Sequence, residues 1–197
     1  ASSVSMISQA WGAHDKERTR LVSQETLWFK VVLAIIGATV MIAVLPAYYR
    51  FFSDDPQVVG YGLSYGVIRL AFLPVFFSSY TVNTIFRYTG DAKTPMRLLV
   101  AASVINIVLD PLLMFSTVPG TTIPGLGLGI AGAAWATVIS ISFSFGVGFF
   151  LLFSGKAPIR LRFRELFRFH RNIDRDLFLI GLPSGLNLLM RNLANFI

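Results

Sequence analysis

Charged residues are scarce in this 197-residue chain, and cysteine is absent. Only 14% of the residues are Asp, Glu, Lys or Arg, whereas a typical soluble domain carries about 25%. This deficit is too large for a surface that faces water, so the composition excludes an ordinary soluble domain. The lack of cysteine excludes disulfides and cysteine-ligated metal sites.

Catalytic motifs are also missing from the chain. It holds no HExxH, no P-loop, no GxSxG and no paired-acid motif. We therefore expect that the protein is not an enzyme and carries no cofactor.

Hydrophobic residues, in contrast, make up 54% of the chain. A helix needs about 20 mostly apolar residues to span a bilayer. Five runs have a matching length, and each contains at most one charged side chain: 31–49, 58–86, 98–118, 126–153 and 177–197. The pattern predicts an all-α membrane protein, a bundle of transmembrane helices. We also expect residues 1–11 to end an earlier span, and the chain to be a piece of a longer protein.

The connections between these runs alternate in charge. Segments 13–30, 87–97 and 156–176 are rich in Lys and Arg, whereas segments 51–57 and 116–125 contain neither. Positive loops stay on the cytoplasmic side of a membrane. Because the charges agree with a chain that crosses back and forth, we expect the three basic segments to be cytoplasmic in a multi-pass protein of the cell (inner or plasma) membrane.

The segment 160–168, RLRFRELFR, interleaves basic and apolar residues. Such a pattern can bind nucleic acid. A cytoplasmic amphipathic linker that rests on anionic lipid is the simpler account. We therefore expect the lipid bilayer, and no nucleic acid, as a partner.

Asp110 is the only acidic residue inside any of the five runs. A carboxylate within the bilayer is costly unless it is protonated, paired or hydrated, and such acids are functional by default. Asn106 lies one helical turn earlier on the same face. Pro111 has no N–H for the carbonyl of Ile107, so that oxygen is freed and a bend is expected. Together these groups predict a site for a proton or a hard cation such as Na⁺; the alternative is a polar network that only fixes helix packing.

Four polar residues in the other runs deserve comparison with Asp110: Tyr65, Asn83, Thr137 and Arg69. Each of the three neutral side chains is more often a satisfied buried group than a ligand. Arg69 follows Tyr65 by one turn. It could be a partner for Asp110, or it could extend toward the membrane interface.

Two local patterns predict where helices begin. In residues 90–95, GDAKTP, Thr94 can be an N-cap with Pro95 at the first helical position. The small residues of 125–134, GLGLGIAGAA, are expected to open the next helix. Small residues let helix backbones approach closely in lipid, where apolar burial drives little association. A substrate path along this face is the other interpretation.

Several of these segments resemble one family. Residues 87–96 (RYTGDAKTPM) look like the cytoplasmic loop signature of the multidrug and toxic compound extrusion (MATE) transporters, and residues 8–15 (SQAWGAHD) look like the loop after their second helix. Residues 106–111 (NIVLDP) and 129–137 (GIAGAAWAT) resemble their fifth and sixth helices, and residues 180–186 (IGLPSGL) the start of the seventh. The matches follow the family order over nearly the whole chain.

The resemblance implies a protein of twelve helices in two six-helix lobes, which exports cationic or amphipathic compounds in exchange for Na⁺ or H⁺. Residues 1–155 would then hold N-lobe helices, from the end of helix two to helix six. Residues 156–176 would be a basic cytoplasmic linker, and 177–197 the first helix of the C-lobe. Arg191 stands near the place of an acid in the NorM-type branch, which argues against a second-lobe site of that type. A monomer is expected.

An acid in the fifth helix, with Asn one turn before it, resembles the DinF-like branch of the family. In that branch the first-lobe cation site uses positions that match Asn106, Asp110 and Thr137. Tyr65 and Asn83 match positions in the adjoining polar network. The branch also uses an acid in its first helix, which would precede residue 1.

Other functions stay open. A lipid-linked saccharide flippase of the same superfamily would need more cations along its cavity, and Arg69 is the only candidate in the first lobe. A non-transporting membrane scaffold would not need a lone buried acid. An intramembrane enzyme would need a second catalytic group that faces Asp110.

Overall fold

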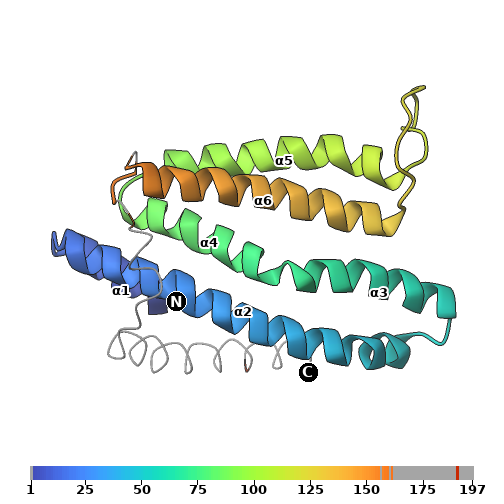
Figure 1. The fold of residues 1–197 in the computed structure, drawn as a ribbon, viewed down its shortest axis with the longest axis horizontal. Helices are drawn as coiled ribbons and strands as arrows, with labels where there is room; N and C mark the ends of the chain where they lie inside the picture. Colours follow the sequence, from blue (N-terminus) through green and yellow to red (C-terminus); the bar gives the residue numbers. More distant parts are fainter. Residues whose placement is uncertain (1, 156, 160, 162–189, 191–197) are drawn as a thin grey trace.

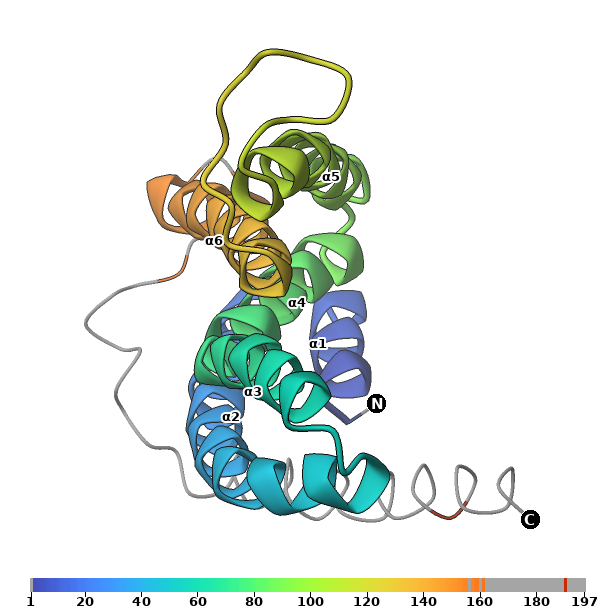
Figure 2. The same ribbon diagram turned by 90° about the vertical axis from the view of Figure 1, so that its right-hand side faces the viewer.

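The computed structural model describes residues 2–155, 157–159, 161 and 190. Within these residues, helices follow one another in the order α1 (Ser2–Gly12), α2 (Lys16–Phe52), α3 (Pro56–Ala71), α4 (Leu73–Tyr88), α5 (Lys93–Met114) and α6 (Ile130–Ser154). The helices lie side by side along one common direction (Figure 1). Seen from the end, α3 and α4 separate α2 from α5 and α6 (Figure 2). The prediction of an all-α bundle is confirmed.

The helices have the dimensions and the surface of a membrane protein. α2, α5 and α6 are long and apolar enough to cross a bilayer, and α3 with α4 forms a fourth candidate as a bent pair. Large apolar side chains such as Ile36, Val104 and Ile107 are more than half exposed, whereas Thr81 and Ser140 are buried. This distribution suits a lipid solvent, in which helices associate through small and hydroxyl-bearing residues.

The first basic segment is mostly helical. Residues 13–15 make the turn between α1 and α2, and the Asp15 carboxylate accepts a hydrogen bond from the N–H of Arg18 at 2.9 Å. From there α2 runs for 37 residues. Its first turns bury Val22 and Leu27 against α1 and α4. The prediction of a loop over residues 13–30 is therefore wrong, because most of the segment is the packed start of a helix. Lys16 and Arg18 are exposed, whereas Arg20 and Glu25 are buried with the packed residues.

The predicted span 58–86 is a bent pair of helices. α3 ends at Ala71, α4 begins at Leu73, and the two axes differ by 49°. Pro74 lies at the start of α4 and has no N–H for the carbonyl of Leu70, so the helical hydrogen-bond ladder stops here. Each half has 16 residues, which is too short to cross the hydrocarbon core alone.

Helix α5 begins at Lys93, before the predicted N-cap Thr94. The Asp91 carboxylate accepts hydrogen bonds from the N–H of Lys93 at 3.2 Å and from the N–H and hydroxyl of Thr94 at 3.0 and 2.5 Å. A carboxylate is a stronger acceptor than a hydroxyl, so Asp91 takes the capping role. Pro95 becomes the third helical residue, where an N–H has no helical partner in any case. The predictions for Thr94 and Pro95 are wrong by this shift.

The glycine-rich connection completes the end of α5. α6 begins at Ile130, later than the predicted start near residue 126. Residues before it run along the end of α5 and donate backbone hydrogen bonds to carbonyls that a helix C-terminus leaves unsatisfied. The pairs are Leu126 to Leu112, Leu128 to Leu113 and Gly129 to Met114, at 2.8, 2.9 and 2.9 Å. The connection thereby fixes α6 against α5.

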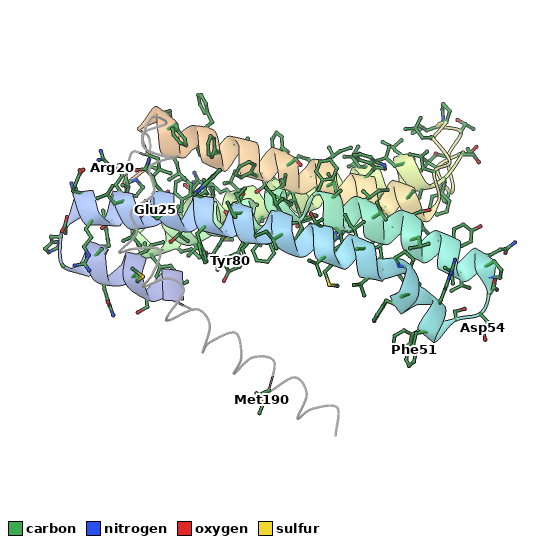
Figure 3. All side chains as sticks on the ribbon, turned by 60° about the horizontal axis from the view of Figure 1, so that its bottom comes forward. Arg20, Glu25, Phe51, Asp54, Tyr80 and Met190 are labelled. Atoms are coloured by element: carbon green, nitrogen blue, oxygen red, sulfur yellow. The ribbon has the colours of Figure 1, made fainter. Side chains whose placement is uncertain are left out.

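The two ends of the bundle differ. Arg20 and Glu25 lie at the end where α1 packs, and Phe51 and Asp54 lie at the opposite end (Figure 3). Near the second end the rings of Tyr48, Phe51 and Phe52 contact one another, with centroids 4.9 Å (48–52) and 5.3 Å (51–52) apart. Aromatic clusters are favoured at membrane interfaces. Apart from residues 157–159, 161 and 190, the predicted linker 156–176 and last span 177–197 lie outside the described residues.

Candidate functional site

Asn106 and Asp110 lie one turn apart on α5, and their side chains meet. Nδ2 of Asn106 donates a long hydrogen bond of 3.4 Å to Oδ1 of Asp110. Both residues are half-buried. Within the described part of the chain, Asp110 forms no ion pair. The structure thus joins two of the predicted cation ligands and leaves Oδ2 of the carboxylate for another partner.

Pro111 adds a third oxygen to this region. It lies inside α5 and cannot donate to the carbonyl of Ile107, which therefore keeps its lone pairs. The helix closes soon afterwards, where the N–H of Phe115 bonds to the carbonyl of Pro111 at 3.3 Å. The carboxylate, amide and carbonyl oxygens thus lie in the last turns of α5, close to the end that residues 116–129 cover, and not halfway along the helix.

Close packing of α6 on α5 sets the depth of Thr137. A Cβ added to Gly132 would lie 2.5 Å from the carbonyl oxygen of Leu113, and one added to Gly148, further along, would lie 3.1 Å from the side chain of Leu98. The two helices are antiparallel and rise about 1.5 Å per residue, so Thr137 lies at roughly the depth of Asp110.

The Thr137 hydroxyl bonds within its own helix. It donates to the carbonyl of Ala133 at 3.0 Å, and no hydrogen bond joins it to Asn106 or Asp110. A hydroxyl oxygen that donates still has lone pairs to offer. The structure therefore places Thr137 level with the pair without direct contact.

The break between α3 and α4 lies at the same depth. The ring of Phe72, at the break, packs edge-on against Trp135 of α6, with centroids 5.6 Å apart. By the same antiparallel register, Trp135 is roughly level with Pro111. We call Phe72, Trp135, Pro111 and Asp110 the break layer. This layer contains the break between α3 and α4, the proline within α5, and Asp110, the only acidic residue of the five apolar runs.

Arg69 lies next to the break but not on Asp110. Its Cζ is 4.7 Å from the ring centre of Phe76 and 5.8 Å from that of Tyr65. Both distances are within the range of cation–π attraction. Tyr65 belongs to α3 and Phe76 to α4, so the guanidinium bridges the break. Of the two alternatives for Arg69, the pairing with Asp110 is not found among the described residues, where Arg20 pairs with Glu17.

Asn83 lies far from the pair. The neighbouring Val82 has its Cγ1 2.8 Å from a Cβ built on Gly148, and that Cβ is also 3.1 Å from Leu98. Leu98 precedes Asp110 on α5 by some three turns, so about 18 Å of helix separates the two levels. The amide oxygen of Asn83 is buried and has no hydrogen-bond partner among the described residues. Such an oxygen needs a donor, because leaving it unpaired costs about 1–3 kcal/mol.

Sequence reasoning did not single out Phe72 or Trp135. Pro74, within a long apolar run, was the available signal for a break, because proline interrupts the helical ladder. No three His, Cys, Asp or Glu side chains gather in the part of the chain that the structure describes. Hard cations such as Na⁺ need oxygen ligands, which one carboxylate and neutral oxygens supply.

Comparison with known proteins adds a family to this geometry. Residues 1–112 match the family model MatE. The "Probable multidrug resistance protein YoeA" of Bacillus subtilis (strain 168) is 32% identical over 96% of this chain and 40% of its own length. A solved structure described as the outward-facing conformation of a multidrug resistance MATE family transporter matches with a TM-score of 0.85 and 28% identity, over 99% of this chain and 41% of that one. An inward-facing conformation matches with a TM-score of 0.79 and 28% identity, over 94% and 40%. The chain thus spans about two fifths of the proteins it matches.

Proposed function

The chain belongs to the MatE family, and from this membership we propose that it is part of an antiporter that exports cationic or amphipathic drugs by alternating access, in exchange for Na⁺ or H⁺. The relatives named above are described as multidrug resistance proteins, which supports drug export. The hydrogen-bonded Asn106–Asp110 pair at the level of the helix break is the observation that carries the coupling to a cation.

The pair has to reorganise when it binds a cation. In the structure the Asn106 amide N–H points at the carboxylate of Asp110. A Na⁺ held between the two side chains requires an oxygen from Asn106, and rotation of the amide by about 180° supplies it. Asp110, Asn106 and the freed carbonyl of Ile107 would then surround the ion, with Thr137 at the same depth as the next ligand. This rearrangement lies in the break layer, where helix geometry is least constrained.

The membrane potential can drive such a change. Moving one charge through 100 mV is worth about 2.3 kcal/mol, which shifts a two-state equilibrium roughly fifty-fold. Differential binding of the ion to the two shapes converts this free energy into transport. In the proposed orientation the basic segments near residues 13–30 and 87–97 face the cytoplasm, so the break layer lies toward the outer half of the bilayer.

The test is drug efflux from proteoliposomes that contain the full-length protein, under an imposed Na⁺ or pH gradient. Asp110→Asn should reduce gradient-driven export at least ten-fold, with membrane insertion unchanged. Asp54→Asn is the matched control, because it removes an exposed carboxylate outside the helices and should leave export intact. Undiminished export by Asp110→Asn would refute the coupling role.

The flippase alternative receives less support. It would need cations that line a cavity to hold a phosphate. Between residues 58 and 86 the sequence contains one Lys or Arg, which is Arg69. Its guanidinium is engaged by Tyr65 and Phe76, on both sides of the break.

A further inference from the structure

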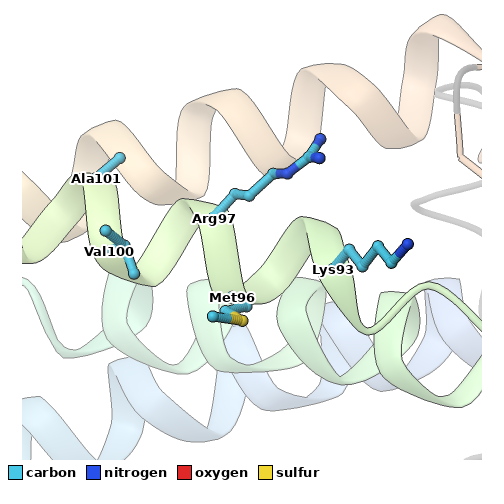
Figure 4. A pocket seen from close by; sticks show the side chains of 5 residues that line it. All are labelled: Lys93, Met96, Arg97, Val100 and Ala101. Atoms are coloured by element: carbon cyan, nitrogen blue, oxygen red, sulfur yellow. The ribbon is translucent and has the colours of Figure 1, made fainter.

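Among the described residues, an exposed side of α5 has a groove that the proposed export mechanism does not use. It has a volume of about 380 Å³ and is lined by Lys93, Met96, Arg97, Val100 and Ala101. Lys93 and Arg97 reach toward the start of α5, away from Val100 and Ala101 (Figure 4). Long cationic side chains in this posture put their charges at the headgroup level while their stems cover apolar surface.

The groove continues as an apolar stripe along the helix. Met96, Val100, Val104 and Val108 are 66%, 54%, 55% and 53% exposed. The distance along the helix from Arg97 to Val108 is about 17 Å, close to half of the roughly 30 Å hydrocarbon core. The stripe therefore matches one acyl chain in length and depth, with the two cations above it.

The charges of the groove favour an anionic ligand. Neither Lys93 nor Arg97 forms an ion pair within the described residues. The nearest acid is Asp91, whose oxygens accept hydrogen bonds from Lys93 and Thr94 at the start of the helix. Two cations and one acid leave one net positive charge beside an apolar stripe.

We propose that this groove binds an anionic phospholipid, with the phosphate between Lys93 and Arg97 and an acyl chain along Val100 and Val104. A zwitterionic lipid presents a cation of its own beside the phosphate and gains less from the pair. The site is separate from the coupling pair, because Arg97 and Asp110 point about 140° apart around α5 at about 100° per residue. In the proposed orientation the lipid belongs to the cytoplasmic leaflet, where anionic lipids attract Lys and Arg.

The experiment measures lipid retention by the full-length protein in detergent, by native mass spectrometry with phosphatidylglycerol, phosphatidylcholine or inorganic phosphate added. The wild type should retain phosphatidylglycerol at least five-fold better than phosphatidylcholine, and should not retain phosphate alone. Lys93→Gln and Arg97→Gln should each weaken phosphatidylglycerol retention about five-fold, as expected for one cation near a lipid surface. Ala101→Leu keeps both charges but fills the groove, and should also reduce retention.

The control is Lys16→Gln with Arg18→Gln, which removes two exposed cations at the same end of the bundle but outside the groove. This control should retain the lipid as the wild type does. Equal losses in the control and in the groove variants would show a general attraction of charge and overturn the proposal. Wild-type retention by Lys93→Gln with Arg97→Gln, or equal retention of the two lipids, would overturn it as well.

Discussion

Gly132 tests the close contact that sets α6 against the break layer. A Cβ at this position would lie 2.5 Å from the oxygen and 2.6 Å from the carbon of the Leu113 carbonyl, and 2.8 Å from the nitrogen of Met114. All three are backbone atoms that no rotamer change can move away. The carbonyl is further held by its hydrogen bond from the N–H of Leu128. Gly132→Ala must therefore displace α6 from α5.

Two other glycines of α6 calibrate the size of this effect. Gly148 meets only side-chain methyls, Val82 Cγ1 at 2.8 Å and Leu98 Cδ1 at 3.1 Å, and these can turn aside. Gly146 has nothing within 4 Å of the added carbon. Replacing a glycine in the middle of a helix by alanine stabilises it by about 0.5–1 kcal/mol. Overpacking costs about 1–3 kcal/mol.

The three variants should therefore form a graded series. The Gly146→Ala variant should be more stable than the wild type by about 0.5–1 kcal/mol. The stability of Gly148→Ala should differ from the wild type by about 1 kcal/mol or less. Gly132→Ala, at the rigid contact, should lose about 1–2 kcal/mol after the gain in helix propensity is subtracted. Thermal unfolding of the full-length protein in detergent, followed by circular dichroism, gives the order of the midpoints. A Gly132→Ala protein as stable as Gly146→Ala would refute the assigned packing of α6 on α5.

The other predictions concern the break and the start of α5. Phe72→Ala should lower stability by about 0.5–1.5 kcal/mol beyond the loss of buried area, because it removes the ring contact with Trp135; the matched variant Phe143→Ala, at an exposed position of α6, should not, and equal losses would contradict the role of the contact. The hydrogen bond from the Thr94 hydroxyl, followed by the backbone N–H of Thr94, lowers the pKa of Asp91 below its ordinary value of 3.8. Because the pKa is lower in the folded protein, Asp91 stabilises the fold fully above about pH 4 and loses this contribution as the pH falls through its folded value. Asp91→Asn should therefore reduce stability by no more than about 1 kcal/mol at pH 7 and flatten the acid limb of a pH–stability curve; an unchanged acid limb would contradict the capping role.

The fold class, the family and the Asn106–Asp110 contact could be read from the sequence because each depends on a local pattern. Apolar length predicts spans, and a spacing of four residues predicts side chains on one helical face. The helical start of α2 could not be read in the same way. Its charged residues are typical of a loop, and only the packing against α1 and α4 shows that this part of the helix, Arg20 and Glu25 included, is buried. The contact of Arg69 with the Phe76 ring could not be predicted for a similar reason. Phe76 lies on the other helix of the bent pair, and the 49° bend between the helices is a feature of the tertiary structure.

The starts of α5 and α6 show a different limit. Asp91 and Thr94 are both good caps, and the choice between them depends on which acceptor reaches two N–H groups at once. For α6, residues 125–129 alternate glycine with leucine, Gly127 and Gly129 have positive φ, and the end of α5 offers carbonyls that need donors. Residues 126–129 donate hydrogen bonds to these carbonyls, and α6 begins only after them, at Ile130. Such competition between local propensity and a partner elsewhere in the chain is decided by tertiary structure.

The proposed coupling requires that one ion can change the packing of the break layer, and the energies of the contacts there are of the right size. In lipid, apolar burial contributes little to helix association, so α3, α4, α5 and α6 are held by contacts such as Phe72 with Trp135. An aromatic contact of this kind is worth about 0.5–1.5 kcal/mol. One charge moved through 100 mV supplies about 2.3 kcal/mol, which is of the same size. Pro74 leaves the carbonyl of Leu70, and Pro111 that of Ile107, without the usual i+4 donor, so the hydrogen-bond ladder that resists bending is incomplete on both sides of the layer. In the proposed mechanism, ion occupancy at Asp110 would therefore supply enough free energy to favour one of two packings of the layer, whereas it would be too weak to bend a helix with a complete ladder.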